Sequence, residues 1–543
     1  MSATTRRRGP HPQPEIFVLV PLIILAALIA LGFWLGLLAA LLVAALVTLA
    51  ASLGVLIWGS LRRRPEIDRA ARYLARPAQM PGMSTRGATA VAVRVGARTG
   101  RPGVHIGRSV RGNRDLWGSW EDMHMDIWGP RTGKTATRAI PAVVAAPGAV
   151  VVTSNKRDIV DATRGVRERR GPVWVFDPQG QAGEPPSWWW DPLTFVGDNI
   201  ARGLMLASFF SGINRASHAR SDGYFEPAGQ TLFGSFLLAA SIDRKPITAT
   251  LKWLARHNDD TPVRILRAGG HHTAADAAEM IRAAPAEQRA GVYGTAAQIA
   301  SPLLSPSVTE WVTPGSNPRR RQFRHADFAA RDDGTIYLLS EETNKFAAPL
   351  ILALVSGLAY AQEGRAISSP SGRLPVPAMY VLDEAANVCP WLELPFLYSH
   401  YGSRGIIMMT ILQSWAQGVS VWGEAAMASM WSAANVRVYG GGSADTRFLG
   451  DLSQASPVFQ PGTTSVGFST GSVFSRTVTR ASREEPVLNI ADLGNMPRGR
   501  ALVQVGGARP TLVRTVPWWQ GPYADDIRAS LARYGPRPQA AAS

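Results

Sequence analysis

The sequence predicts an α/β fold built on a mostly parallel sheet, and three observations point to it. Short apolar runs, rich in β-branched and aromatic residues, alternate with helical stretches, as expected for strands buried on both faces of such a sheet. A Gly-rich turn stands between one of these runs and a helical stretch, and two adjacent acids end another run. The predicted strands lie at residues 123–127, 149–153, 173–176, 335–339, 379–382, 406–409 and 436–439.

The composition bounds the classes of function. The chain has 543 residues, of which 46% are hydrophobic, so it is long enough for roughly two or three domains. Its one cysteine, Cys389, excludes an intrachain disulfide and suits a reducing compartment. The net charge of +17 favours anionic partners, namely nucleic acid, lipid headgroups or nucleotide.

The N-terminal region predicts a transmembrane hairpin. No charged residue occurs at 16–58, and a single helix of that length would be about 65 Å long, roughly twice a hydrocarbon core. We therefore expect two spans, with the reversal near the glycines and aromatics of 32–36. Arginines at 6–8 and 62–64 flank the hairpin, which predicts a cytoplasmic arm at 1–15, a cytoplasmic bulk, and a multi-pass protein of the cell membrane.

The Gly-rich turn has the layout of a P-loop. It lies between a predicted strand and a helix-like run, and it ends in Lys-Thr. The backbone N–H groups of such a turn wrap a phosphate, the lysine reaches the β- and γ-phosphates, and the threonine hydroxyl binds Mg²⁺. The sequence therefore predicts a nucleotide site, with Thr135 also a metal ligand, made by Gly129, Pro130, Arg131, Thr132, Gly133, Lys134 and Thr135.

One position departs from the usual P-loop pattern. A glycine normally stands five residues before Gly133, and Trp128 occupies that place here. Either the loop is one residue shorter than usual, or Trp128 takes the position of the first glycine.

The two adjacent acids have a Walker B arrangement, because they end an apolar strand. Asp383 is predicted to hold Mg²⁺ through its shell, and Glu384 to orient and polarise the attacking water. Gln413 ends the next strand and is predicted to sense the γ-phosphate or to position the water, the alternative being a surface amide. Arg404, Arg437 and Arg447 are candidates for an arginine finger given in trans by a neighbouring subunit, and a surface ion pair is the alternative for each. Arg404, just before that strand, is the one chosen here.

The spacing of these motifs predicts the domain organisation. A connector at 65–121 follows the hairpin, and the alternation of Val91, Val93 and Val95 predicts an edge strand within it. The P-loop and the acid pair lie about 250 residues apart, so something is inserted between them. The expected parts after the connector are a first nucleotide-binding part at 122–195, a helical domain at 196–330, a second nucleotide-binding part at 331–520 and a tail at 521–543, disordered at its end.

These features together predict a RecA-like P-loop NTPase, and they resemble a known family. The two spans, the P-loop, the helical insertion, Leu-Asp-Glu-Ala at 382–385 and Ile-Leu-Gln-Ser at 411–414 are similar to the TraG/TraD coupling proteins of conjugation and type IV secretion. Two further similarities to this family are Phe-Asp-Pro at 176–178 and three glycines at 440–442.

The resemblance implies a membrane-anchored, homo-hexameric ATPase that uses ATP and Mg²⁺. It would hand DNA, expected to be single-stranded with a bound relaxase, to the proteins of a secretion channel. Two alternatives stay open: a double-stranded DNA translocase of the FtsK type, and a coupling or recruitment protein for protein substrates.

Overall fold

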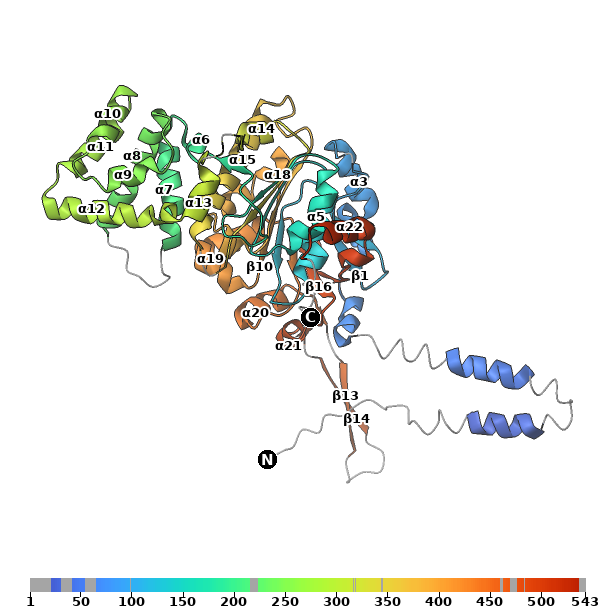
Figure 1. Cartoon of the computed structure of the whole chain (residues 1–543). Coiled ribbons are helices and arrows are strands. Elements are labelled where there is room, and N and C mark those ends of the chain that lie inside the picture. The colour runs from blue at the N-terminus through green and yellow to red at the C-terminus, as the bar shows by residue number, and fades with distance from the viewer. Residues whose placement is uncertain are drawn as a thin grey trace, which may run out of the picture. The chain divides into compact units, whose positions relative to one another are not determined.

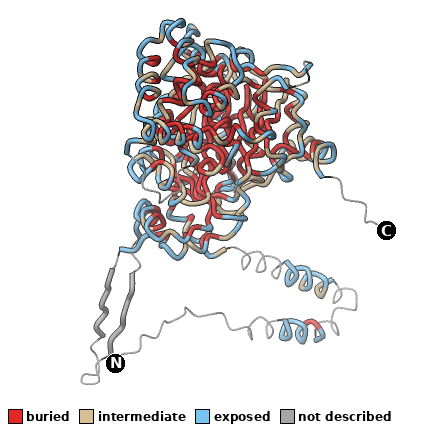
Figure 2. Tube along the Cα trace, turned by 60° about the vertical axis from the view of Figure 1, so that its left-hand side comes forward, coloured by how far each residue is buried: buried red, intermediate tan, exposed pale blue. Residues whose placement is uncertain are grey.

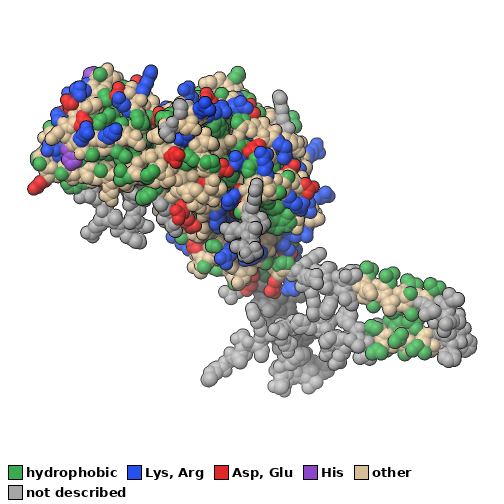
Figure 3. All heavy atoms as spheres, viewed as in Figure 1, with side chains coloured by type: hydrophobic (Ala, Val, Ile, Leu, Met, Phe, Trp, Pro, Cys, Tyr) green, Lys and Arg blue, Asp and Glu red, His purple; other side chains and the backbone are tan. Residues whose placement is uncertain are grey.

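The computed structural model describes residues 21–30, 42–53, 65–97, 99–214, 223–315, 317, 319–342, 345–459, 462–468, 476–482 and 484–536 (Figure 1). The chain divides into two compact units, Met1–Arg69 and Ala70–Ser543. Acidic and basic side chains intermingle over the face of the second unit that Figure 3 shows.

The first unit contains helix at residues 21–30 and 42–53. Most of the apolar side chains on these helices are exposed. Within the described part of the chain, none of the helices has both the length and the apolar character that a membrane span requires. The other parts of the predicted hairpin, at 16–20, 31–41 and 54–58, lie outside the described residues.

The second unit is built on one mixed sheet of 11 strands, in the order β2-β1-β17-β16-β11-β3-β10-β9-β4-β8-β5. The strands from β11 to β5 run parallel, and β16, β17, β1 and β2 extend that sheet with antiparallel pairings. The predicted α/β fold is therefore confirmed. The strands are β1 (Val104–Ser109), β2 (Asp115–Gly118), β3 (His124–Ile127), β4 (Val150–Ser154), β5 (Val173–Phe176), β8 (Thr335–Leu339), β9 (Ala378–Leu382), β10 (Ile406–Leu412), β11 (Val436–Tyr439), β16 (Arg500–Val505) and β17 (Thr511–Arg514).

The sheet and its nearest helices form the core, where the buried residues gather (Figure 2). Parallel strands need crossover connections, and helices provide most of them. These helices are η4 (Thr135–Ala139), α4 (Ile140–Ala145), α5 (Asp158–Glu168), η6 (Lys345–Ala347), α15 (Ala348–Ser368), α16 (Ala385–Val388), α17 (Leu394–Leu397), α18 (Tyr401–Arg404), α19 (Trp415–Ala433), α20 (Thr446–Gln454) and α21 (Ile490–Gly494).

Between β5 and β8 the chain makes a long excursion that is mostly helical (green to yellow in Figure 1). Two short strands, β6 (Trp188–Trp190) and β7 (Arg321–Phe323), pair in parallel at its beginning and end. The helices are α6 (Leu193–Val196), α7 (Ile200–Asn214), α8 (Phe225–Ile242), α9 (Ala249–Leu254), α10 (Thr261–Ala268), α11 (His272–Arg282), α12 (Ala286–Ile299), η5 (Ser301–Leu304), α13 (Pro306–Val312) and α14 (His325–Ala329).

The edge strand predicted around Val91 and Val95 is wrong, because that segment is helix α3 (Thr85–Arg94). The Ser84 hydroxyl caps this helix by accepting a hydrogen bond from the Gly87 amide at 3.0 Å. Val91 and Val95 are four residues apart, so their spacing fits one helical face as well as a strand.

The remaining elements lie in the connector and in the C-terminal region. The tail predicted from residue 521 contains a helix, α22, and residues after 536 lie outside the described part. The elements are η1 (Glu66–Arg72), η2 (Pro77–Gln79), η3 (Pro81–Met83), β12 (Val458–Phe459), β13 (Gly462–Phe468), β14 (Arg476–Ser482), β15 (Glu485–Pro486), η7 (Trp518–Gln520) and α22 (Ala524–Tyr534).

Candidate functional site

The Gly-rich turn connects the end of β3 to η4, as a P-loop does. The Trp128 amide donates to the Leu412 carbonyl at 2.9 Å, so Trp128 continues β3 along its neighbour β10. Its side chain is fully buried. Trp128 therefore continues the strand, and the turn begins at Gly129. Arg131 and Gly133 have positive φ values of 59° and 98°, which turn the chain back toward the helix.

Three glycines after β11 hold the base of this loop. The Gly129 amide donates to the Gly441 carbonyl at 2.9 Å. A Cβ at Gly129 would stand 2.3 Å from the Gly442 carbonyl oxygen, and a Cβ at Gly440 would stand 2.0 Å from the ring of Trp128. Glycine is thus required on both sides of the contact. The sequence analysis used these glycines only as a feature of the family resemblance and did not predict their packing role.

The acid pair lies directly beside the P-loop lysine. Asp383 and Glu384 follow β9, which is separated from β3 by β10 alone. The Lys134 Nζ lies 3.2 Å from Asp383 Oδ1 and forms an ion pair with Glu384 as well. The Thr153 hydroxyl donates to the Asp383 carbonyl at 3.2 Å, which ties the acid pair to β4. The two motifs, about 250 residues apart in the sequence, therefore meet at one edge of the sheet.

Glu384 is held in a conformation that few non-glycine residues adopt. Its φ and ψ are 55° and 41°, in the left-handed region, and only 5% of its surface is exposed. Such backbone strain gathers at functional sites, where surrounding contacts enforce it. Gln413 supplies one of these contacts, because its Nε2 donates to Glu384 Oε2 at 2.7 Å.

The pKa values of Lys134 and Asp383 are both raised, which favours the charged form of the lysine and the neutral form of the acid. Burial alone would lower the pKa of Lys134, but the attraction of Asp383 and Glu384 outweighs it and raises that pKa. At Asp383, burial dominates over the attraction of Lys134 and raises the pKa to about 6. The difference follows from depth, since the side chain of Asp383 is 4% exposed and that of Lys134 is 14% exposed.

The oxygen atoms at this edge fit a hard divalent cation such as Mg²⁺. Asp383 Oδ1 is buried and has no hydrogen-bond partner in the described part of the chain, although it lies near Lys134 Nζ. Thr135 adds a hydroxyl oxygen at the start of η4, next to Lys134. Mg²⁺ prefers oxygen ligands and takes few from the protein, keeping its waters and the substrate phosphates for the rest.

Arg404 is not brought to this edge. It ends α18, just before the amino end of β10, whereas Gln413 follows the carboxyl end of that strand. Its Nη1 donates to the Gly372 carbonyl at 3.1 Å. Within one chain, Arg404 therefore lies a whole strand length from Lys134.

Further polar residues at the same edge were not singled out in the sequence. The Nδ2 atoms of Asn155 and Asn387 donate to the two carboxylate oxygens of Glu342 at 3.1 and 3.2 Å. Burial raises the pKa of Asp158, at the start of α5. The available signal was positional, because Asn155 and Glu342 follow the carboxyl ends of β4 and β8, where ligands of parallel sheets bind.

Comparisons with known proteins agree with this architecture. Residues 377–498 match a family model described as the TraM recognition site of TraD and TraG. The chain is similar to conjugative coupling proteins. A solved structure of the bacterial conjugative coupling protein TrwBdeltaN70 is 17% identical, with 72% of this chain and 84% of that chain covered and a TM-score of 0.53.

Two further TrwB structures give the same picture. TrwB in complex with the ATP analogue ADPNP is 16% identical, covering 73% of this chain and 86% of that chain, with a TM-score of 0.53. TrwB in complex with ADP and Mg²⁺ is 15% identical, covering 73% and 85%, with a TM-score of 0.52. A comparison with curated protein sequences gives no match. The TraG/TraD resemblance is confirmed, and the structures establish a shared fold.

Proposed function

We propose that this chain is a membrane-anchored ATPase that couples ATP hydrolysis to the transfer of DNA into a conjugation or type IV secretion channel. The observation that carries the proposal is the position of the Lys134 ammonium between Asp383 and Glu384. A phosphate-binding lysine has this neighbourhood when the P-loop and the Walker B acids share one nucleotide. The TrwB complexes with ADPNP and with ADP and Mg²⁺ support ATP and Mg²⁺ as ligands.

Each site residue has a task in this proposal. Residues 129–133 wrap the phosphates, and Lys134 leaves its carboxylate partners to bind the β- and γ-phosphates. Thr135 and Asp383 would hold Mg²⁺, which would supply positive charge beside the phosphate oxygens. Glu384 polarises the attacking water, and the hydrogen bond from Gln413 orients the Glu384 carboxylate for that task.

The wider assembly belongs to the same proposal. A hairpin at 16–58 anchors a homo-hexamer, the helical domain at 196–330 moves against the two nucleotide-binding parts at 122–195 and 331–520, and DNA with a bound relaxase passes to the channel proteins. Arg404 acts in trans as the arginine finger, in keeping with its separation from Lys134 of its own chain.

An ATPase assay on the full-length protein tests the proposed hydrolysis site. Lys134→Ala should abolish hydrolysis, with a loss of at least about a hundredfold, because the γ-phosphate loses its cation. Lys252→Ala removes an exposed lysine of the helical excursion and is the matched control, with unchanged turnover expected. The assay is run with and without single-stranded DNA. Normal turnover by Lys134→Ala would refute the proposed site.

A further inference from the structure

A pocket of about 390 Å³ lies away from the P-loop, in the connector region. Three separate segments form it: the chain from the end of η1 through η2, the turn between β1 and β2, and the turn between β16 and β17. Its charged lining consists of Arg72, Arg76, Arg111 and Arg509, and no acidic residue lines it. The tertiary fold thus collects four guanidinium groups from positions as far apart as 72 and 509.

These arginines lack anionic partners within the described part of the chain, where none of the four forms an ion pair. Some are nevertheless held in place. Arg111 donates through Nη1 to the Arg72 carbonyl. The Arg72 guanidinium lies 4.7 Å from the centre of the Tyr73 ring, and Tyr73 stacks on Phe459 at 5.3 Å. Like charges that share a pocket repel one another, and a bound anion would relieve that repulsion.

The chemistry of the lining selects the type of anion. Guanidinium groups present paired N–H donors that match the oxygens of phosphate. Leu74 and Ala78 add apolar surface to the same pocket. A phosphate group joined to an apolar body fits such a lining better than a bare inorganic ion does.

The sequence position of the pocket favours a lipid headgroup as the source of the phosphate. The uncharged stretch 16–58 ends 14 residues before Arg72, and Arg62, Arg63 and Arg64 lie between them. Basic residues just cytoplasmic of a membrane span are attracted to anionic lipid headgroups. We propose that this pocket binds the headgroup phosphate of an anionic phospholipid. This inference rests on the membrane anchor of the proposed function.

Lipid titration of the full-length protein in neutral detergent micelles tests the inference. Phosphatidylglycerol is compared with phosphatidylcholine, inorganic phosphate and a single-stranded oligonucleotide, and binding is read by native mass spectrometry. The test variant is Arg111→Gln/Arg509→Gln. The matched control is Arg256→Gln/Arg319→Gln, which removes the same charge from exposed arginines outside the pocket. Arg509→Gln alone is a second variant that touches no described hydrogen bond.

We expect phosphatidylglycerol to bind the wild type and the control equally, to bind the double variant at least tenfold more weakly, and to bind Arg509→Gln with intermediate affinity. Equal affinity of all variants would overturn the inference. So would inorganic phosphate binding as tightly as the lipid, or a selective loss of oligonucleotide binding. The pocket variants should keep their ATPase activity, so a failed lipid test and a failed ATPase test are distinguishable.

Discussion

Asp383 combines deep burial with a carboxyl oxygen that no described group satisfies by a hydrogen bond. Burial raises the pKa of this carboxyl from 3.8 to about 6. Between pH 3.8 and about pH 6, Asp383 is therefore protonated in the folded protein and ionised in the unfolded chain. Stability from this group is fully present below pH 3.8 and is lost as the pH rises through about 6.

We expect Asp383→Asn to remove this pH dependence. In metal-free buffer, the free energy of unfolding of the wild type relative to Asp383→Asn should fall by about 2 kcal/mol from pH 4 to pH 7, at 1.36 kcal/mol per pKa unit. Urea unfolding of both proteins across that range measures the difference. A difference that stays constant with pH would assign an ordinary pKa to Asp383.

Gly440 is predicted to be essential because of Trp128. The Cβ of Gly440→Ala would stand 2.0 Å from the Trp128 ring, so the base of the P-loop must shift. Overpacking of this kind costs about 1–3 kcal/mol. We expect Gly440→Ala to weaken nucleotide binding, measured by calorimetry, and Trp128→Leu/Gly440→Ala to recover part of it. Gly364→Ala is the control, since a Cβ there meets no atom within 4 Å. Additive effects of Trp128→Leu and Gly440→Ala would argue against the contact.

The outcome at these residues separates what a sequence can predict from what it cannot. Lys134, Asp383, Glu384 and Gln413 could be placed together, because each lies on the segment that follows a strand, and parallel strands bring their carboxyl ends to one edge. The role of Gly440 could not, since its need for glycine comes from a ring 312 residues earlier in the chain.

At the scale of elements, a buried ion pair fixes η4 to β3. Arg138, in η4, donates through Nε to the Asp126 carboxylate at 2.6 Å, and neither side chain is exposed. The Trp128 indole donates to the same carboxylate at 3.2 Å. His124 packs beside the Arg138 guanidinium at 3.2 Å, and burial lowers the pKa of His124 well below its usual value, so it is neutral. The orientation of the P-loop thus depends on a pair behind it.

Removing one member of this pair should be severe. Arg138→Met leaves the Asp126 carboxylate buried without its cation, which costs about 3–5 kcal/mol. The double variant Asp126→Leu/Arg138→Met should be more stable than Arg138→Met, because no charge stays buried. Arg264→Met, from an exposed pair with Asp260, should change stability by less than about 1 kcal/mol. Urea midpoints measure all three, and a mild Arg138→Met would show that water reaches Asp126.

The helices and strands could be predicted wherever the spacing of apolar residues fitted only one type of secondary structure. The strands from 149 to 439 are short apolar runs that no helix of normal length could use, and the structure has each of them as a strand. The helix at residues 85–94 could not be predicted in this way. The valines at 91, 93 and 95 alternate as in a strand, while Ala88 and Ala92 repeat at helical spacing. The Ser84 cap and the burial of both alanines decide for the helix.

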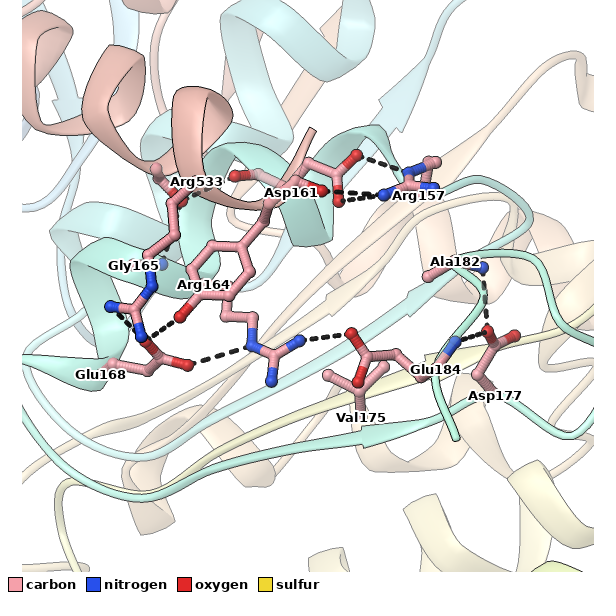
Figure 4. Close-up of polar contacts among 12 residues, drawn as sticks. Arg157, Asp161, Arg164, Gly165, Glu168, Val175, Asp177, Ala182, Glu184 and Arg533 are labelled. Atoms are coloured by element: carbon pink, nitrogen blue, oxygen red, sulfur yellow. Dashed lines mark hydrogen bonds and ion pairs between the residues drawn. The ribbon is translucent and has the colours of Figure 1, made fainter. Parts of the chain in front are cut away.

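At the scale of the whole second unit, the last described helix lies against an early helix of the core. α22 packs on α5, and Figure 4 shows the polar contacts around this junction. The Ser530 hydroxyl donates to the Asp161 carbonyl at 2.6 Å and accepts from the Gly165 amide at 2.9 Å. Arg157 adds a hydrogen bond to the Tyr534 carbonyl at 2.8 Å. Such a link between distant segments is invisible to local sequence patterns, which is why only a tail was expected.

The buried apolar contact of α22 with the core should stabilise α5 more than the exposed charged side chains of α22 do. Ile527 is 1% exposed and belongs to the main core cluster, so Ile527→Ala should cost about 2–4 kcal/mol. Arg528→Ala is the matched control on the next residue, whose side chain is 56% exposed, and should change stability by less than about 0.5 kcal/mol. Hydrogen exchange of the amides at 158–168 measures the local effect. Faster exchange there in Ile527→Ala, with Arg528→Ala like the wild type, is expected because α5 starts three residues after Asn155 of the candidate site. Unchanged exchange in Ile527→Ala would mean that β4 and the sheet hold α5 without its C-terminal partner.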